Sequence, residues 1–135
     1  MRDDSLALLH ASFATVFEKK TDIAGCFYDN LFRDAPEARG LFSNDLTRQK
    51  EMFASMLTEI VSCAETPEAF ADKVKSLGES HKRYKIPAAH FEIAGKALLG
   101  ALAVELDGLL SSTEMRAWNL AAEAMTEAMT SASAA

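Results

Sequence analysis

Hydrophobic positions along the chain follow the period of an amphipathic helix. Apolar residues recur at spacings of three and four, and they nowhere alternate over a length typical of a strand. The three prolines, at positions 36, 67 and 87, each fit a boundary, because proline is tolerated in the first turn of a helix but not in its interior. The sequence therefore predicts an all-α fold.

Seven helices of unequal length are expected between these boundaries. The last one begins near Ser112, where the sequence SSTE is typical of a capping box, and the tail from Thr130 is expected to fray. Breaks are expected at Thr21–Asp22, where either residue can cap the next helix, after Ser43–Asn44, and at Ile86–Pro87. The expected helices cover about residues 4–19, 22–32, 36–42, 46–65, 67–81, 88–106 and 112–129.

Composition and charge narrow the classes of protein to which the chain can belong. With 135 residues, of which 49% are apolar and 25% charged, we expect one domain over residues 1–135. A net charge of −6 argues against an extended surface for nucleic acid or an anionic membrane, because either partner needs a basic face. The acidic start differs from a signal peptide, and no apolar window approaches the ~18 residues of a membrane span. The two cysteines lie outside any CxxC pattern and suit a reducing compartment. Together these features favour a soluble cytoplasmic protein.

Three polar residues interrupt the apolar faces of three different helices. His81 stands where leucine would complete a stripe, Gln49 interrupts a second one, and Tyr28 lies in a third. Taken singly, each fits a structural role, as a half-exposed histidine, a solvent-facing glutamine and a core tyrosine. A buried polar group without a partner costs about 1–3 kcal/mol, so three such residues favour one shared cavity. An imidazole facing an amide and a phenol across an apolar pocket suits a planar iron cofactor, although spacing alone does not establish iron.

Other chemistries lack their motifs. The sequence contains no HExxH, GxGxxG, P-loop or GxSxG pattern. Its histidines are His10, His81 and His90, and the last two are nine residues apart across an expected helix break, so a zinc site of several imidazoles is not expected. Hydrolytic chemistry therefore has little support.

Several segments together resemble the single-domain bacterial globins of the flavohaemoglobin-related family, over about residues 5–130. Each segment is a weak match, but their order and spacing are specific. The resemblance implies a globin fold, a three-over-three helical sandwich around a pocket for haem b, with the D helix short or absent. The matching segments are FYDNLFRDAPEARGLF at 27–42, RQKEMF at 48–53, LGESHKRYKIPAAHFEIAGKALLGAL at 77–102, and Trp118.

The resemblance also implies roles for individual residues. His81 matches the proximal haem ligand, and Phe42 matches the phenylalanine that stacks on the porphyrin ring. Tyr28 and Gln49 match the distal residues of the B and E helices. Phe53 stands where the family usually has leucine, which implies a tighter ligand pocket.

Further positions match haem contacts on the proximal side. Ile86 and Phe91 fall on haem-contacting positions beyond the proximal ligand, and Ala94 lies one turn further along the same face. Lys82 and Arg83 are candidates for meeting the haem propionates, and a solvated helix end explains them equally well.

One departure from the family concerns the proximal histidine. The enzymatic flavohaemoglobins place a glutamate and a tyrosine behind the proximal imidazole, and these positions fall on Ser133 and Phe91 here. We therefore expect His81 to be held mainly by a backbone carbonyl one turn back, near Leu77, with less electronic push toward oxygen-bond cleavage. Gly78, in the same helix, permits close approach of a neighbouring element.

These matches imply a haem b globin that binds oxygen and other diatomic gases, including nitric oxide and carbon monoxide, reversibly and with high affinity. Tyr28 is expected to donate a hydrogen bond to the bound ligand, with Gln49 reinforcing it directly or through Tyr28. Two alternatives stay open. One is nitric oxide dioxygenation with an external reductase, since the chain ends where the reductase domain of the enzymes would begin. The other is a gas-sensing or haemless interaction module. The lack of a spare apolar face favours a monomer or weak dimer.

Overall fold

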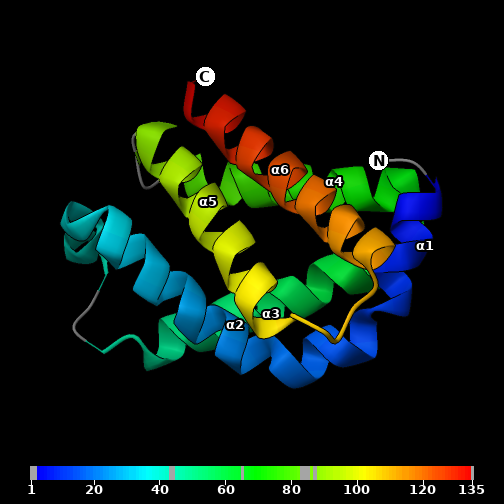
Figure 1. Cartoon of the computed structure of the whole chain (residues 1–135). Coiled ribbons are helices and arrows are strands. Elements are labelled where there is room, and N and C mark those ends of the chain that lie inside the picture. The colour runs from blue at the N-terminus through cyan, green and yellow to red at the C-terminus, as the bar shows by residue number, and fades with distance from the viewer. Residues whose placement is uncertain (1–2, 43–44, 65, 83–85, 87, 135) are drawn as a thin grey trace.

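The computed structural model describes residues 3–42, 45–64, 66–82, 86 and 88–134, except for the side chains of residues 3, 133 and 134. Over these residues the chain is helical and contains no strand, which confirms the all-α prediction (Figure 1). The elements are α1 (Asp3–Ala11), α2 (Phe13–Asp34), the 3₁₀ helix η1 (Pro36–Leu41), α3 (Thr47–Ser62), α4 (Pro67–Lys82), α5 (Ala88–Glu105) and α6 (Ser112–Ala134).

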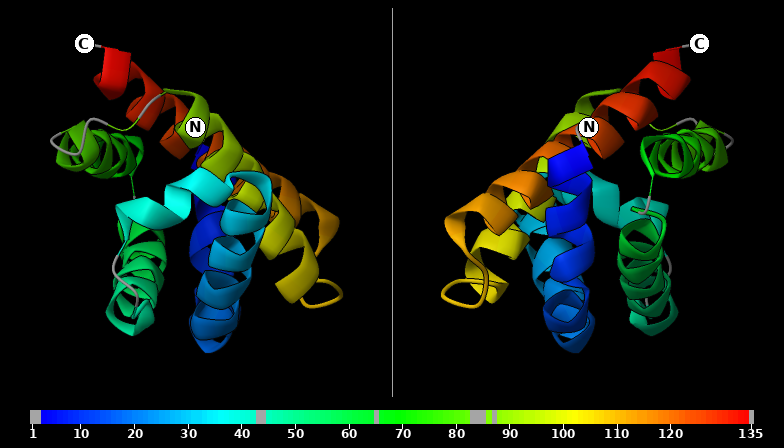
Figure 2. Two further views of the ribbon diagram at one scale, coloured as in Figure 1. Left: turned by 90° about the vertical axis from the view of Figure 1, so that its left-hand side faces the viewer. Right: turned by 90° about the vertical axis from the view of Figure 1, so that its right-hand side faces the viewer.

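The packing of α5 against α6 forms the centre of the molecule. Helix α2 packs across α5, α3 lies on α2, and both α1 and α4 lie on α6. Helices α3 and α4 lie one above the other on the same side of the molecule but make few contacts with each other (Figure 2). The two helices that carry Gln49 and His81 are therefore held in place by different neighbours.

The first helix boundary differs from the prediction. The expected break at Thr21–Asp22 is wrong, because α2 continues through these residues, and the break lies at Ser12 instead. The Ser12 side chain is 1% exposed, and its hydroxyl donates a hydrogen bond to the Leu9 carbonyl oxygen at 2.7 Å. The same hydroxyl oxygen accepts a hydrogen bond from the Trp118 indole Nε1 at 2.9 Å. The break is thus tied to a partner on α6, which no local pattern can reveal.

Removing the Ser12 hydroxyl tests this link. We expect Ser12→Ala to lower the free energy of unfolding by about 1–3 kcal/mol, because the buried Trp118 N–H loses its acceptor. Ser62→Ala is the matched control, since Ser62 donates the same kind of bond, to the Glu59 carbonyl oxygen at 2.9 Å, but is exposed. Urea unfolding of both variants gives the comparison, and equal losses would contradict the proposed role of the Trp118 bond.

The last helix confirms one expectation and corrects another. A capping box is present, because the Ser111 N–H donates to Glu114 Oε1 at 2.9 Å and the Glu114 N–H donates to Ser111 Oγ at 3.1 Å. The expected fraying from Thr130 is wrong, because α6 continues to Ala134. Alanine has the highest helix propensity, so this alanine-rich end extends the helix.

The remaining boundaries agree with the prediction where the structure describes them. The short piece from Pro36 is present as η1, and α4 and α5 begin at or next to the expected positions. Gly108, with φ of 74°, makes the turn after α5, a conformation that favours glycine. The expected breaks at Ser43–Asn44 and Pro87 lie outside the described residues.

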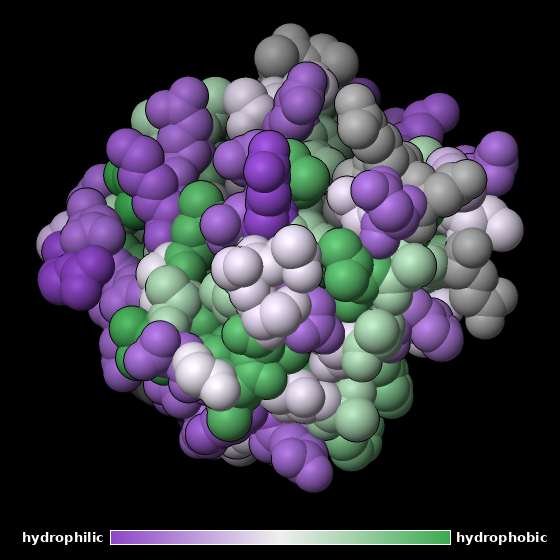
Figure 3. All heavy atoms as spheres, turned by 45° about the vertical axis from the view of Figure 1, so that its right-hand side comes forward, coloured by the Kyte–Doolittle hydropathy of each residue, from purple (hydrophilic) through white to green (hydrophobic). Residues whose placement is uncertain are grey.

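The surface of the described residues mixes polar and apolar side chains. On the face in Figure 3, hydrophobic patches are bordered by hydrophilic side chains. In the part of the chain that the structure describes, no helix is long and apolar enough to cross a membrane. Cys26 and Cys63 are unpaired and half-buried, and burial raises the pKa of the Cys26 thiol. The large exposed hydrophobic residues are Phe13, Phe17, Leu41, Met52, Val104, Leu109 and Leu120.

Candidate functional site

An aromatic cluster surrounds Tyr28, which α2 places in the interior with 3% of its surface exposed. The ring of Phe42, just after η1, lies edge-on to Tyr28 with the centroids 5.6 Å apart. The ring of Phe53, on α3, also lies edge-on to Tyr28, at 5.8 Å. Phe53 in turn stacks on Phe27 at 4.3 Å with an interplanar angle of 16°. The structure thus brings together the predicted distal residues Tyr28 and Phe53 and the predicted porphyrin-stacking residue Phe42.

The Gln49 side chain, on α3, interacts with the phenol of Tyr28, on α2. Burial raises the pKa of the Tyr28 phenol, and a hydrogen bond from the Gln49 side chain partly offsets this shift. The phenol is therefore neutral at physiological pH and keeps its proton. Because the Gln49 amide donates to the phenolic oxygen, the Tyr28 O–H is left to donate to a further acceptor.

His81, near the end of α4, contacts the backbone of its own helix. Its Nδ1 lies 2.8 Å from the Leu77 carbonyl oxygen one turn back, as the sequence analysis expects. A carbonyl oxygen only accepts hydrogen bonds, so Nδ1 must carry the proton. In the neutral ring the lone pair then lies on Nε2, the arrangement that histidine ligands of metals usually adopt.

Phe91 lies behind this imidazole. It is buried on α5, and its ring meets the His81 ring edge-on at a centroid distance of 6.2 Å. A phenylalanine there packs against the imidazole but offers it no hydrogen bond. Ser133 stands where the flavohaemoglobin enzymes have the glutamate behind the histidine, and its side chain is not among those that the structure describes.

The residues present fit a large planar apolar group such as haem. Helix α3 carries Gln49 and helix α4 carries His81, and these two helices make few contacts with each other. Several apolar side chains of the predicted haem pocket are only half-buried. A single imidazole with its lone pair on Nε2 and a neutral phenol donor match the needs of iron and of a polarised ligand on iron. The half-buried apolar residues from this predicted set are Phe42, Phe53, Leu77, Ile86 and Ala94.

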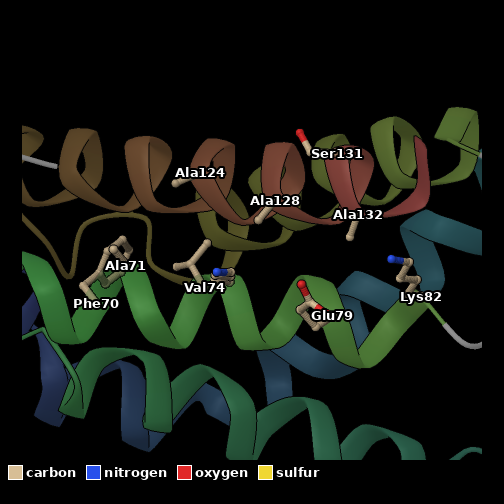
Figure 4. A pocket seen from close by; sticks show the side chains of 10 residues that line it. Phe70, Ala71, Val74, Glu79, Lys82, Ala124, Ala128, Ser131 and Ala132 are labelled. Atoms are coloured by element: carbon tan, nitrogen blue, oxygen red, sulfur yellow. The ribbon is translucent and has the colours of Figure 1, made fainter. Parts of the chain in front are cut away.

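A groove of about 490 Å³ runs between α4 and α6 (Figure 4). Phe70 and Val74 line it from α4, and Ala124 and Ala128 line it from α6. The exposed Lys82 side chain also lines this groove, so contact between Lys82 and a haem propionate stays a prediction. Arg83, the other candidate, lies outside the described residues.

Two contacts between side chains were not predicted from the sequence. Phe27 stacks directly on Phe53, although its position only marked it as part of an apolar face. His90, on α5, places Nε2 3.3 Å from Glu37 Oε1 and so joins the first turn of α5 to η1. The pKa of Glu37 is lowered by its own backbone N–H and by His90. Neither contact has a sequence signal, because each joins residues far apart in the chain.

Comparison with known protein families identifies the chain. The family model described as Globin matches residues 25–129. The chain belongs to the globin family. The match includes the positions from Tyr28 through His81 to Trp118.

The relatives of this globin include proteins that are much longer. A flavohemoprotein from Bacillus subtilis is 28% identical over 102 residues, which are 73% of this chain and 26% of that protein. The chain thus spans about a quarter of the length of this curated relative. The globin is related to flavohaemoglobins, and its length matches only one part of them.

Solved structures share the fold along nearly the whole chain. A Rhodothermus marinus protein, named as an engineered carbene transferase with nitric oxide dioxygenase as its proposed activity, superposes with a TM-score of 0.81 and 23% identity. The alignment covers 99% of this chain and 94% of that chain. A flavohemoglobin from Malassezia yamatoensis, solved with bound FAD and heme, gives a TM-score of 0.73 at 18% identity and covers 96% of this chain and 36% of that one. At these identities the likeness shows the globin fold.

Proposed function

We propose that this globin binds haem b and takes up oxygen, nitric oxide or carbon monoxide reversibly and with high affinity. The observation that carries the proposal is the hydrogen bond from His81 Nδ1 to the Leu77 carbonyl oxygen. It fixes the tautomer in which Nε2 can bind iron, and it holds the ring at a set angle to α4. Haem b, when bound, would supply the iron atom that takes a diatomic gas.

Different residues of the chain would contact the haem and the gas ligand. His81 holds the iron, and Phe42, Phe53, Ile86, Phe91 and Ala94 supply apolar contacts to the porphyrin. On the distal side, Tyr28 donates a hydrogen bond to the gas ligand, and Gln49 orients the phenol through its own bond to the phenolic oxygen. The surrounding aromatic rings keep water away from this donor, which strengthens the hydrogen bond. We propose that Phe53, stacked on Phe27, narrows the distal pocket.

Titration of the purified protein with haemin tests the proposal. We expect saturation at one haem per chain, and spectra of the reduced protein that change on addition of carbon monoxide. The spectrum of the reduced, ligand-free form should show five-coordinate iron, since His81 is the only iron ligand proposed. A protein that stays colourless with added haemin would exclude this function and favour a haemless interaction module.

Nitric oxide dioxygenation is the competing function. Several relatives are flavohemoproteins, and the Tyr28–Gln49 pair would equally hold oxygen for reaction with nitric oxide to give nitrate. Repeated turnover requires an electron donor, so this activity would depend on a reductase. Nitrate yield in the presence of a generic reductase separates the two functions. A single stoichiometric burst indicates a reversible binder, and many turnovers indicate an enzyme.

We also propose a cytoplasmic protein that works as a single globin domain and as a monomer or weak dimer. The chain's acidic balance supports the absence of a nucleic-acid partner. Sedimentation of the haem-loaded protein at several concentrations measures the oligomeric state directly.

A further inference from the structure

Helices α4 and α6 approach each other closely at Gly78, about one turn before His81. Gly78 is buried, and a Cβ atom on it would lie 2.7 Å from the Ala128 carbonyl oxygen and 3.0 Å from the Ala128 carbonyl carbon. Such distances are shorter than real contacts of a Cβ atom. Because the opposing atoms belong to the backbone of α6, no change of rotamer can make room for a side chain at Gly78.

The other glycines in helices differ from Gly78 in this respect. A Cβ atom on Gly95 would meet the side chain of Thr126, and one on Gly25 would meet nothing within 4 Å. Gly78 is thus the one glycine of the six whose missing side chain brings two helix backbones together. Glycine is less favourable than alanine inside a helix, so Gly78 lowers the local stability of α4 while it permits the close approach of α6.

The same peptide unit holds the imidazole. The carbonyl that accepts the His81 Nδ1 hydrogen bond belongs to Leu77 and is bonded to the nitrogen of Gly78. The Cα of Gly78, at one end of this peptide unit, therefore faces the backbone of α6, while the carbonyl oxygen of the same unit accepts the hydrogen bond from His81. The groove lined by Val74 and Ala124 runs between the same two helices, and Ala128 also borders it (Figure 4).

We propose that Gly78 is a positioning residue for His81. Its backbone contact with Ala128 sets the place of the Leu77 carbonyl, and through it the angle and hydrogen-bond strength of the imidazole that holds the iron. Helix α6 thereby acts on the proximal ligand through the backbone and needs no side chain for it. The part that concerns iron rests on the proposed haem-binding function.

The test is Gly78→Ala, read out at the imidazole. We expect the added methyl group to push α4 away from α6 and to shift the Leu77 carbonyl. In the haem-free protein, the His81 Nδ1 proton, followed by nitrogen-15 NMR, should then exchange faster with solvent. In the haem-loaded protein, the iron–histidine stretching band should move, and haem release should become roughly ten- to a hundredfold faster, as for other residues that orient metal ligands.

Two further variants separate positioning from general destabilisation. Ser12→Ala removes the bond between Ser12, at the break between α1 and α2, and Trp118 on α6. It leaves the contact between Gly78 and Ala128 in place, so the iron–histidine band and the Nδ1 exchange should stay unchanged. Gly25→Ala, in open space on α2, should leave both readouts as they are in the unmodified protein. If Ser12→Ala shifts the band as much as Gly78→Ala does, the proposed positioning role is wrong.

A milder variant covers the case in which Gly78→Ala does not fold. Ala128→Val enlarges the opposite side of the same contact, and its side chain borders the open groove, so α4 should shift less. We expect the same direction of change in the band and in Nδ1 exchange, with smaller size. An unchanged Nδ1 exchange rate in both variants would overturn the proposal while leaving haem binding intact. Failure of the unmodified protein to bind haem would overturn the proposed function and leave the NMR comparison valid.

Discussion

Replacing His81 by alanine is expected to abolish stoichiometric haem binding. The imidazole is the only group that we propose as an iron ligand, and its tautomer is fixed by the Leu77 carbonyl at 2.8 Å. Without Nε2, haem would be held by apolar contacts alone. We expect titration of His81→Ala with haemin to show no saturation at one haem per chain, and the reduced protein to lack the five-coordinate spectrum.

Two controls make this result specific. His10→Ala removes an exposed histidine on α1 and should bind haem as the unmodified protein does. His81→Gly in the presence of free imidazole should recover the spectrum, because the small molecule can replace the missing ligand nitrogen. Full persistence of the haem spectrum in His81→Ala would refute the assignment of His81 as the ligand.

Replacing Tyr28 by phenylalanine is expected to speed oxygen release at least about tenfold. A hydrogen bond to a polarised acceptor contributes roughly 1.5–3 kcal/mol, and each ~1.4 kcal/mol corresponds to a factor of ten. The Tyr28 phenol is buried and neutral, and Gln49 donates to its oxygen, so its proton is available to the ligand. Stopped-flow mixing of the oxygenated protein with carbon monoxide measures the release rate.

The release rate of oxygen in Tyr28→Phe can be compared with that in a second variant, Gln49→Leu, and with the release rate of carbon monoxide. Gln49 acts on the phenol, so Gln49→Leu should speed oxygen release less than Tyr28→Phe does. Carbon monoxide becomes less polarised than oxygen when it binds, so its release should change less in both variants. An oxygen release rate that is the same in Tyr28→Phe and in the unmodified protein would rule out the distal role of Tyr28.

The helices could be predicted because their cause is local. An apolar residue every three or four positions buries one face of a helix wherever that helix packs, so the pattern at 70–81 indicates α4 without knowledge of its neighbours. The helix boundaries that were predicted wrongly depend on atoms distant in the chain or on the helix propensity of alanine. Ser12 ends α1 because its hydroxyl bonds Trp118 across the core, and the alanine-rich tail extends α6 beyond Thr130.

The candidate site could be predicted in part. His81, Gln49 and Tyr28 each stand out as polar residues on apolar faces, and the structure pairs Tyr28 with Gln49. The acceptor for His81 was expected because it lies one turn back on the same helix, a local relation. The stacking of Phe27 on Phe53 and the pairing of His90 with Glu37 join different elements, so no spacing in the sequence predicts them.

The sequence by itself determined the all-helical class, because the hydrophobic period is carried locally. It also marked His81 and Tyr28 as polar residues on apolar faces, and the resemblance to bacterial globins implied the roles that we propose for them. The tertiary structure decided how the residues meet. It set Gln49 against the Tyr28 phenol and the backbone of α6 against Gly78, because such contacts arise only when helices distant in the chain pack together. We propose that the angle of His81 depends on that packing, since the carbonyl that holds it is bonded to Gly78, whose Cα faces the backbone of α6.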